Sequence, residues 1–559
     1  MTVHELGASL QQTFAEKIID IDSPQPGHLY MTIDPGSVVE VAAHLQNDLG
    51  CRFVINAGTD RRRERGKFLI THFFAKDEDG IYLALHAEVD ADDPKIASIT
   101  PLVPAANWAE REARDMVGVV PEGHPDPRRL VLADDWPEDL YPLRWDVPHG
   151  IKPPPSDHTV PRKPPPEGSS VVPIGPYFPA LEEPAYFRIF AEGEQVVGAD
   201  YRGFYNHRGI EKMGCSVLTY NQIPFIAERI CGICGCVHST CYCQAVETAA
   251  GIEIPLRAKY IRTIMLELER LESHLLWLGI AGHIIGFDTV LMQVWRMREP
   301  LMWLCERLTG NRKTYATNII GGVRRDIEPD AYDDIRSVIA DIEREWQALY
   351  ASIPGDTTLL ARLRGPGMLP KALAVKRCAV GPTARGSGVN IDVRVDHPYA
   401  AYDRLDVKKC VHDGCDNLAR TLVRLDETLV SIAIIRQALD DMPEGPVLTE
   451  VTEDIPAGRQ AMSAVEAPRG EVFHWVLTGP DNRPERWRVR APTYANLQVV
   501  PPMLVGSALA DVPINIGSFD PCFSCTDRMA VLDINSGQLR ICSAEELTSS
   551  KGQSGPHYS

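Results

Sequence analysis

The chain has 559 residues, of which 44% are hydrophobic, and a formal net charge of −19. This length allows several folded units with large cores, and the composition excludes a mainly disordered protein. The acidic balance predicts that the chain binds no nucleic acid, which requires a basic surface. We expect no secretory signal, because no basic segment precedes an apolar run at the N-terminus, and the most apolar stretch, 275–287, is too short to cross a bilayer. These features predict a cytoplasmic chain that reaches a membrane only by docking to another subunit.

Residues 1–146 are expected to form a small α+β domain. The apolar segment Leu29–Ile33 predicts a strand, and Asp34-Pro35 is a good helix start for a helix through Leu49. Two further strands, Phe68–Phe74 and Ile81–Val89, are joined through Asp79-Gly80, which is typical of a hairpin. A charged helix, NWAEREARDMVGV, follows in the last part of the domain.

Residues 147–175 contain two PPP runs, which favour an extended linker. After a strand-like opening, residues 176–528 are expected to be mainly helical. Pro255 starts a helix whose apolar residues recur every three or four positions, and a second long helix is predicted over Asn417–Leu439. The predicted fold class is therefore α+β: a small N-terminal α+β domain, a Pro-rich linker and a large, mainly helical bundle domain with short strands around a metal site. Residues 529–559 form a polar C-terminal extension.

Two Cys-x-x-Cys pairs provide the strongest chemical signal. Cys231 and Cys234 lie in ERICGICGCVH, and Cys522 and Cys525 lie in FDPCFSCTDR. This spacing allows both sulfurs of a pair to reach one metal, and the two pairs together would supply four thiolates. Zinc, an iron–sulfur cluster and a soft redox metal all remain open on spacing alone, although zinc ribbons usually place their pairs much closer together.

The residues around both pairs carry a family resemblance. Arg-x-Cys-Gly-x-Cys-x-x-x-His at 229–238 and Asp-Pro-Cys-x-x-Cys-x-x-Arg at 520–528 resemble the two signatures of nickel–iron hydrogenase large subunits. The segments DYRGFYNHRGIEK (200–212) and EAPRG (466–470) are similar to the membrane-bound, energy-converting, formate-hydrogenlyase-type branch. Residues 110–146 resemble the small peripheral-arm subunit of complex I, which implies docking rather than chemistry.

The resemblance implies a reaction and a set of metal ligands. The reaction is the reversible heterolytic cleavage or formation of H₂ at a Ni–Fe centre. Cys231 and Cys522 would be terminal nickel ligands, Cys234 and Cys525 would bridge to iron, and the iron would carry carbon monoxide and cyanide.

It also implies roles for residues beyond the four cysteines. Arg469 would lie over the open metal position, Cys522 would accept the first proton, and Glu183, or its neighbour Glu182, would pass protons onward. His238 would donate a hydrogen bond to a bridging sulfur. Without the family match, Arg469 would be interpreted as a surface ion pair, and His238 would be a candidate zinc ligand.

Three further residues are expected near the metals. Glu211 matches a carboxylate that binds a second divalent cation, but Arg528 stands where many members have His, and arginine cannot ligate a cation. Arg385 and Asp326 are expected to line or brace the iron pocket, or else to form a buried ion pair with each other. Cys215, Cys236, Cys241 and Cys243 are interpreted as packed small hydrophobes.

The resemblance finally implies partners and processing. The expected partners are a small [4Fe–4S] subunit that takes the electrons, integral membrane subunits, nickel-insertion factors and an endopeptidase that cleaves between Arg528 and Met529. The complex would lie on the cytoplasmic face of the membrane. Two rival functions are an electron-transfer subunit of complex I with a quinone site, where the four cysteines are absent, and a non-catalytic zinc scaffold, which would not explain EAPRG or RGIEK.

Overall fold

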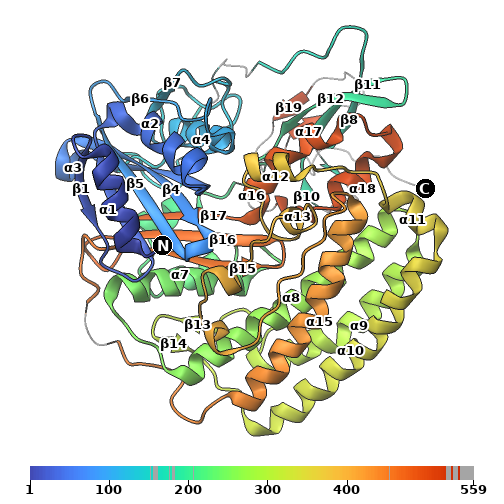
Figure 1. Ribbon diagram of the computed structural model, residues 1–559. Coiled ribbons are helices and arrows are strands. Elements are labelled where there is room, and N and C mark those ends of the chain that lie inside the picture. Colours follow the sequence, from blue (N-terminus) through green and yellow to red (C-terminus); the bar gives the residue numbers. More distant parts are fainter. Residues whose placement is uncertain are drawn as a thin grey trace, which may run out of the picture.

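The computed structural model describes residues 1–541 except 152, 155, 157–160, 176, 179–182, 206, 452–453, 524–529 and 533–538. The N-terminal domain, a central three-stranded sheet and a bundle of long helices follow one another across the molecule, as Figure 1 shows. No helix in the described part of the chain combines the length and the hydropathy needed to cross a membrane.

The N-terminal domain is built on a five-stranded sheet with the order β1-β2-β5-β4-β3. Its strands are β1 (Ile18–Asp22), β2 (His28–Ile33), β3 (Arg52–Arg61), β4 (Lys67–Lys76) and β5 (Ile81–Asp90). The predicted hairpin is confirmed, because β4 and β5 pair antiparallel and Gly80 adopts a φ of 67° in the turn between them. β2 pairs with β5 in parallel.

Two helical predictions in this domain need refinement. After Asp34 the chain forms a 3-10 turn, then α2 (Val38–Ala43), and then a π-helical turn rather than one regular helix. The charged helix is α4 (Asn107–Val117), but much of its charge is buried. Glu110, for example, accepts hydrogen bonds from the hydroxyls of Ser98 and Thr100, both at 2.6 Å. Satisfied partners allow these charges to lie inside the protein.

The linker ends earlier than predicted. Residues 161–169 are almost all exposed, whereas Ser170–Ile174 form strand β8. This strand pairs antiparallel with β11 (Tyr186–Glu192), which also pairs with β12 (Gln195–Arg202). The last residues of the Pro-rich segment therefore belong to a sheet of the second unit.

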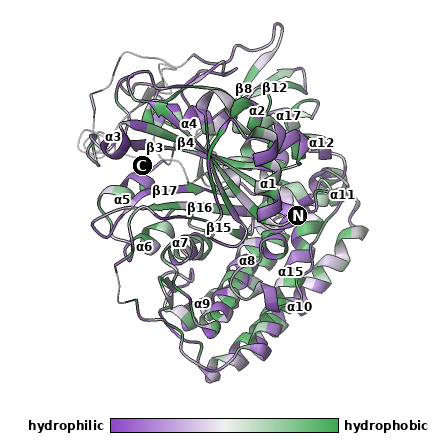
Figure 2. Cartoon of the chain, turned by 60° about the vertical axis from the view of Figure 1, so that its left-hand side comes forward, coloured by the Kyte–Doolittle hydropathy of each residue, from purple (hydrophilic) through white to green (hydrophobic). Residues whose placement is uncertain are grey.

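Long helices form the core of that unit. They are α7 (Gly235–Ala250), α8 (Leu256–Ile284), α9 (Asp288–Thr309), α10 (Tyr332–Ser352) and α15 (Asn417–Asp441). The predicted start of α8 at Pro255 and the predicted helix over Asn417–Leu439 are both confirmed. α8 packs against both α9 and α15 and is buried on nearly all sides. Figure 2 shows apolar residues along these inner helices and strands, whereas the short helix α3 (Arg62–Arg65) is hydrophilic.

A second antiparallel sheet joins the two units. It contains β15 (Gln460–Ala467), β16 (Gly470–Thr478) and β17 (Pro484–Arg490), which the sequence analysis did not predict. α7 packs on β15 and β16, while Phe473 and Trp475 of β16 contact Phe73 of the N-terminal sheet with ring centroids 5.1 and 5.4 Å apart. In Figure 1 this sheet lies between the N-terminal domain and α7.

Candidate metal centre

The first cysteine pair lies on the loop before α7. Cys231 follows the short helix α6 (Ile223–Ala227), and Cys234 is the N-cap residue of α7. The backbone N–H of Cys234 points at the sulfur of Cys231, with the nitrogen 3.4 Å from Sγ. Gly235 is required here, because a Cβ would lie 2.3 Å from the ring of Tyr315 and 2.8 Å from the carbonyl oxygen of Glu228.

The chain brings the second pair back to the first. Cys522 follows α18 (Val512–Gly517), and its N–H donates to Oγ1 of Thr493 at 3.1 Å. Its Sγ lies 3.1 Å from Sγ of Cys231, although the two residues are 291 positions apart. Cys231, Cys234 and Cys522 are all buried. Cys525 lies outside the described residues.

Arg469 lies beside this pocket, in the turn between β15 and β16. Its Nε donates to the carbonyl oxygen of Asp520 and its Nη2 to the Asp520 carboxylate, both at 2.7 Å, while Nη1 donates to Ser273 Oγ at 3.2 Å. Asp520 adopts a φ of 56°, a strained value for a residue with a side chain. Arg469 is 2% exposed, so it is not part of a surface ion pair.

The electrostatics of the pocket favour a thiolate at Cys231, whereas the hydrogen bond with Cys231 and burial hold the pKa of Cys234 well above its ordinary value. Hydrogen bonds with Cys234 and Cys522, together with the charge of Arg469, hold the pKa of Cys231 well below its ordinary value, although burial opposes this. Burial would also lower the pKa of Arg469, but Asp520 and the cysteines raise it, so the guanidinium stays charged. A buried guanidinium beside soft sulfur ligands is a setting that stabilises negative charge.

His238 lies one turn into α7 and is fully buried. Its Nδ1 is 3.1 Å from Nε2 of His474 on β16, and burial lowers the pKa of His238 to about 4. The imidazole is therefore neutral at pH 7. Its Nε2 has no hydrogen-bond partner among the described residues.

Glu269 is a functional neighbour that the sequence analysis missed. This buried carboxylate of α8 accepts the N–H groups of Cys236 at 2.9 Å and Val237 at 3.0 Å. It caps the first turn of α7 from another helix, directly after Cys234. Glutamate within a predicted helix usually indicates a solvated face, and nothing in its spacing revealed this role.

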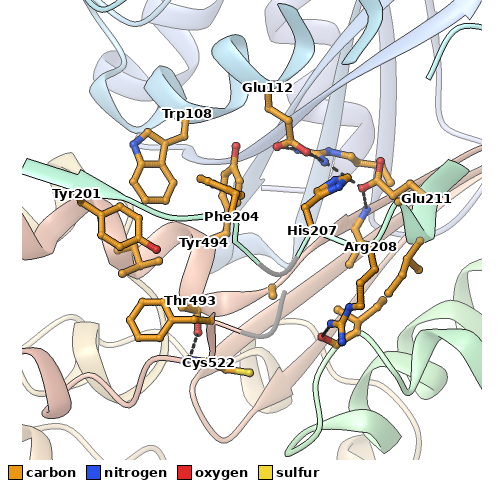
Figure 3. A pocket seen from close by; sticks show the side chains of 18 residues that line it. Trp108, Glu112, Tyr201, Phe204, His207, Arg208, Glu211, Thr493, Tyr494 and Cys522 are labelled. Carbon is orange, nitrogen blue, oxygen red and sulfur yellow. Dashed lines mark hydrogen bonds and ion pairs between the residues drawn. The ribbon is translucent and has the colours of Figure 1, made fainter. Parts of the chain in front are cut away.

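A cavity of about 100 Å³ opens beside Cys522 between the two units. Figure 3 shows Trp108 and Glu112 of the N-terminal domain on one side and Thr493 and Cys522 on another. Its aromatic lining includes Trp108, Tyr201, Phe204, Tyr494 and Phe523. The lining also includes the charged residues Glu112, Arg208, Glu211 and Arg488, so the cavity combines aromatic and charged walls.

Comparisons with known proteins agree with this geometry. Residues 208–283 match the family described as nickel-dependent hydrogenase. Residues 285–462 and 451–528 match the 49 Kd subunit of respiratory-chain NADH dehydrogenase, and residues 31–152 match its 30 Kd subunit. The chain is 40% identical to formate hydrogenlyase subunit 5 of Escherichia coli over 97% of its own length and 96% of that protein.

The chain belongs to the formate-hydrogenlyase-type nickel–iron hydrogenase large subunits. Hydrogenase-4 component G of Escherichia coli is also 40% identical, over 97% of this chain and 95% of that protein. A solved structure of the membrane-bound sulfane sulfur reductase, an archaeal respiratory membrane complex, contains a chain that is 31% identical with a TM-score of 0.62. That match covers 66% of this hydrogenase-family chain and all of the other.

Glu211 is not arranged as a cation ligand in this family member. It lies in α5 (Ile210–Ser216), and its carboxylate is bound by Arg486 at 2.6 Å, by Arg488 at 3.0 Å and by the N–H of Val489 at 3.0 Å. Burial opposes ionisation, but the two arginines lower the pKa of Glu211 to about 2. Two guanidinium groups therefore balance the charge of this carboxylate, and the predicted second cation stays a prediction. Arg528 lies outside the described residues.

Among the described residues, Arg385 and Asp326 do not pair with each other, and neither forms a hydrogen bond with Cys231, Cys234 or Cys522. Arg385 is buried with Glu427 at 2.5 Å and Glu466 at 2.8 Å. Asp326 is bound by Arg257 at 2.8 Å, in the first turn of α8. Ser273, which contacts Arg469, lies 16 residues further along this helix, or about 24 Å at 1.5 Å per residue. Asp326 therefore pairs with Arg257 near the start of α8, and Arg385 pairs with carboxylates of the interior, while the predicted places of both residues near the iron stay predictions.

Some of the remaining predicted residues lie outside the part of the chain that the structure describes. Glu183 lies in the short strand β10 (Glu183–Pro184), but its side chain is outside the described set, as are Glu182 and the proposed cleavage position between Arg528 and Met529. Cys236, Cys241 and Cys243 are fully buried on α7, and burial raises the pKa of each thiol, which agrees with packed, protonated residues.

Proposed function

We propose that this chain is the catalytic subunit of a nickel–iron hydrogenase that cleaves or forms H₂ within a membrane-associated, formate-hydrogenlyase-like complex. The observation that carries the proposal is the buried approach of Cys231 and Cys522, with their sulfurs 3.1 Å apart, beside the Arg469–Asp520 pair. The family to which the chain belongs supports the same activity.

The donor set fits a nickel–iron centre. Three buried cysteines converge from two distant segments, and thiolates are ligands that suit soft, redox-active metals. We propose Cys231 and Cys522 as terminal nickel ligands and Cys234 with Cys525 as bridging ligands, with carbon monoxide and cyanide on the iron. The unpartnered Nε2 of His238 and Oδ2 of Asp520 are further polar groups available to a bound group. When bound, the centre would supply the redox chemistry that splits H₂ heterolytically.

The protein side chains would handle charge and protons. Arg469, held by Asp520 and Ser273, would keep a fixed positive charge at the pocket without exchanging protons at neutral pH. Cys522 would take the first proton on its sulfur, and Glu183 would pass it onward. The aromatic walls of the cavity that Cys522 lines would admit a small neutral molecule.

Other proteins would provide electron transfer, membrane attachment and maturation of the metal site. Electrons would leave through an iron–sulfur small subunit, and integral membrane subunits would hold the assembly at the cytoplasmic face. Nickel-insertion factors and an endopeptidase would complete the site, with cleavage after Arg528. Intact-mass measurement of active protein tests the cleavage, because a mass corresponding to all 559 residues would exclude it.

Metal analysis of the purified complex tests the function. We expect nickel and iron in similar amounts, together with H₂-dependent reduction of methyl viologen. Zinc without nickel, or nickel without any H₂ reaction, would reject the proposal. Cys243→Ser is a matched control for Cys231→Ser, because Cys243 is equally buried on α7 but belongs to a separate hydrophobic cluster.

A further inference from the structure

Three aromatic side chains form a buried chain of hydrogen bonds behind the cysteines. His238 of α7 lies with Nδ1 3.1 Å from Nε2 of His474 on β16. Nδ1 of His474 in turn lies 3.2 Å from Nε1 of Trp487 on β17. The side chains are fully buried, so water cannot take the place of any partner.

The indole of Trp487 determines which atom donates and which accepts in this series of hydrogen bonds. An indole N–H can only donate, so Nδ1 of His474 must accept. His474 is neutral, because burial lowers its pKa well below the ordinary value, and its single ring hydrogen therefore lies on Nε2. That hydrogen is donated to Nδ1 of His238, which leaves the hydrogen of His238 on its own Nε2.

The far end of this series of hydrogen bonds is Nε2 of His238, on the face of α7 that also carries Cys234. Nε2 of His238 is buried and has no partner among the described residues. His238 stands four residues after Cys234 on α7, a spacing that places both on one face of the helix. A buried N–H is almost always paired in a folded protein, so this donor has a partner when the pocket is filled.

We infer that Trp487 and His474 are positioning residues that fix the hydrogen of His238 on Nε2 and so keep an N–H donor directed at the metal-binding cysteines. The inference rests on the proposed nickel–iron site and adds two residues to it. Without the indole N–H, His474 could adopt either tautomer, and His238 would then present a lone pair to the thiolates in part of the molecules.

The indole itself is held rigidly. The backbone N–H of Trp487 donates to Sγ of Cys215 at 3.2 Å, and the ring packs edge-on against Tyr242 with centroids 5.2 Å apart. A Cβ on Gly214 would lie 2.5 Å from the ring, so this glycine leaves room for it. The flanking Arg486 and Arg488 donate to backbone carbonyls of Gly58 and Asn56 in the N-terminal domain, which fixes β17 on its other side.

Trp487→Phe tests the inference, because it keeps a ring and removes the donor. In the purified complex we expect normal nickel content, shifted infrared bands of the carbon monoxide and cyanide ligands, and H₂ activity reduced about 10- to 100-fold, the usual effect of losing a group behind a metal ligand. In metal-free protein labelled with ¹⁵N-histidine, solid-state NMR should show the mixed tautomers of His238. Tyr242→Phe, which touches the same ring but leaves its N–H, should match the wild type in all four measurements.

A second pair of variants covers the case in which Trp487→Phe does not fold. His474→Gln can accept from the indole and donate to His238, so we expect it to keep most activity and the wild-type bands. His474→Leu can do neither and should behave like Trp487→Phe. Wild-type bands and NMR signals in Trp487→Phe or His474→Leu with nickel present would overturn the inference. Absence of nickel from the wild-type complex would instead reject the proposed function.

Discussion

Two buried polar regions, the cluster around Glu211 and the cysteine pocket, satisfy their charges in different ways. Around Glu211, the cations Arg486 and Arg488 face the anions Glu211 and Glu112, with contacts of 2.6 to 3.0 Å. The charges balance without an added ion. In the cysteine pocket, the guanidinium of Arg469 pairs with Asp520. The buried Arg424 also interacts electrostatically with Asp520, and its Nε and Nη2 have no hydrogen-bond partner among the described residues.

The difference indicates which region needs a metal. Buried charges are stable only when they are paired or coordinate a metal. Glu211 is paired completely by arginines, while the cysteine pocket retains unpartnered polar atoms on His238 and Asp520. A carboxylate that resembles a ligand is therefore not sufficient evidence for a cation site. The charged groups that surround the carboxylate determine whether it binds a cation.

Replacing a cysteine should have the largest effect. Cys522→Ser substitutes a hard hydroxyl for a soft thiolate, so nickel should be lost along with H₂ activity. We expect a decrease greater than the about 10- to 100-fold typical of groups behind the ligands. Nickel content and viologen reduction measure it, with Cys243→Ser as the control. Normal nickel in Cys522→Ser would contradict the assignment of Cys522.

Arg469→Lys should leave the metal bound but impair turnover. Lysine keeps the charge but cannot donate to both the carbonyl and the carboxylate of Asp520. We expect about a 10²-fold loss of activity, comparable with removing one preorganised donor from an active site. Arg394→Lys, in a buried ion pair elsewhere, should lower thermal stability without this loss at a permissive temperature. Equal activity losses in both variants would mean that Arg469 is only structural.

Glu211→Gln should reduce stability rather than metal content. The substitution leaves Arg486 and Arg488 buried with one carboxylate fewer, which costs about 3–5 kcal/mol for a broken buried pair. We expect a lower unfolding midpoint with unchanged nickel. Added Mg²⁺ or a chelator should not shift the midpoint of the wild type. A chelator-dependent midpoint that disappears in Glu211→Gln would restore the cation site.

The same residue should give a pH signature. The pKa of Glu211 is lowered to about 2 from its ordinary 4.5, so its stabilising effect is complete above pH 4.5 and is lost as the pH falls toward 2. The difference in unfolding free energy between the wild type and Glu211→Gln should therefore shrink as the pH falls from 4.5 toward 2. Unfolding measured by fluorescence at several pH values tests it, and a difference that is constant from pH 6 to 3 would contradict the pairing.

These regions also mark what the sequence could predict. Helix α8 and helix α15 were predictable because a starting residue and an apolar repeat are local signals. The four cysteines were recognisable because both pairs carry flanking signatures. Sheet β15–β17 was missed because β15 and β16 are buried on both faces, which removes the alternation that indicates a strand.

The sequence could not predict which side chains pair across long stretches of the chain. Nothing local links Glu211 to Arg488, 277 positions later, or His238 to His474, 236 positions later. The partner of Asp326, Arg257, likewise lies 69 residues earlier and could not be predicted from the segment around Asp326. Residue types indicated the chemistry, but tertiary contacts determined which charges were already satisfied.

Glu112→Gln should have the smallest effect and separates the roles of the two carboxylates. Glu112 binds Arg488 through both oxygens, at 2.6 and 2.7 Å, from helix α4 of the N-terminal domain. Its loss leaves Arg488 paired with Glu211. We therefore expect the unfolding free energy to fall by about 1.5–3 kcal/mol, the range for hydrogen bonds to charged groups. Combining it with Glu211→Gln should cost more than the sum, because Arg488 then loses its last carboxylate. Simple additivity in this double-mutant cycle would show that the two carboxylates act independently on Arg488. The charge balance that disfavours a cation would then rest on Glu211 and Arg486 alone.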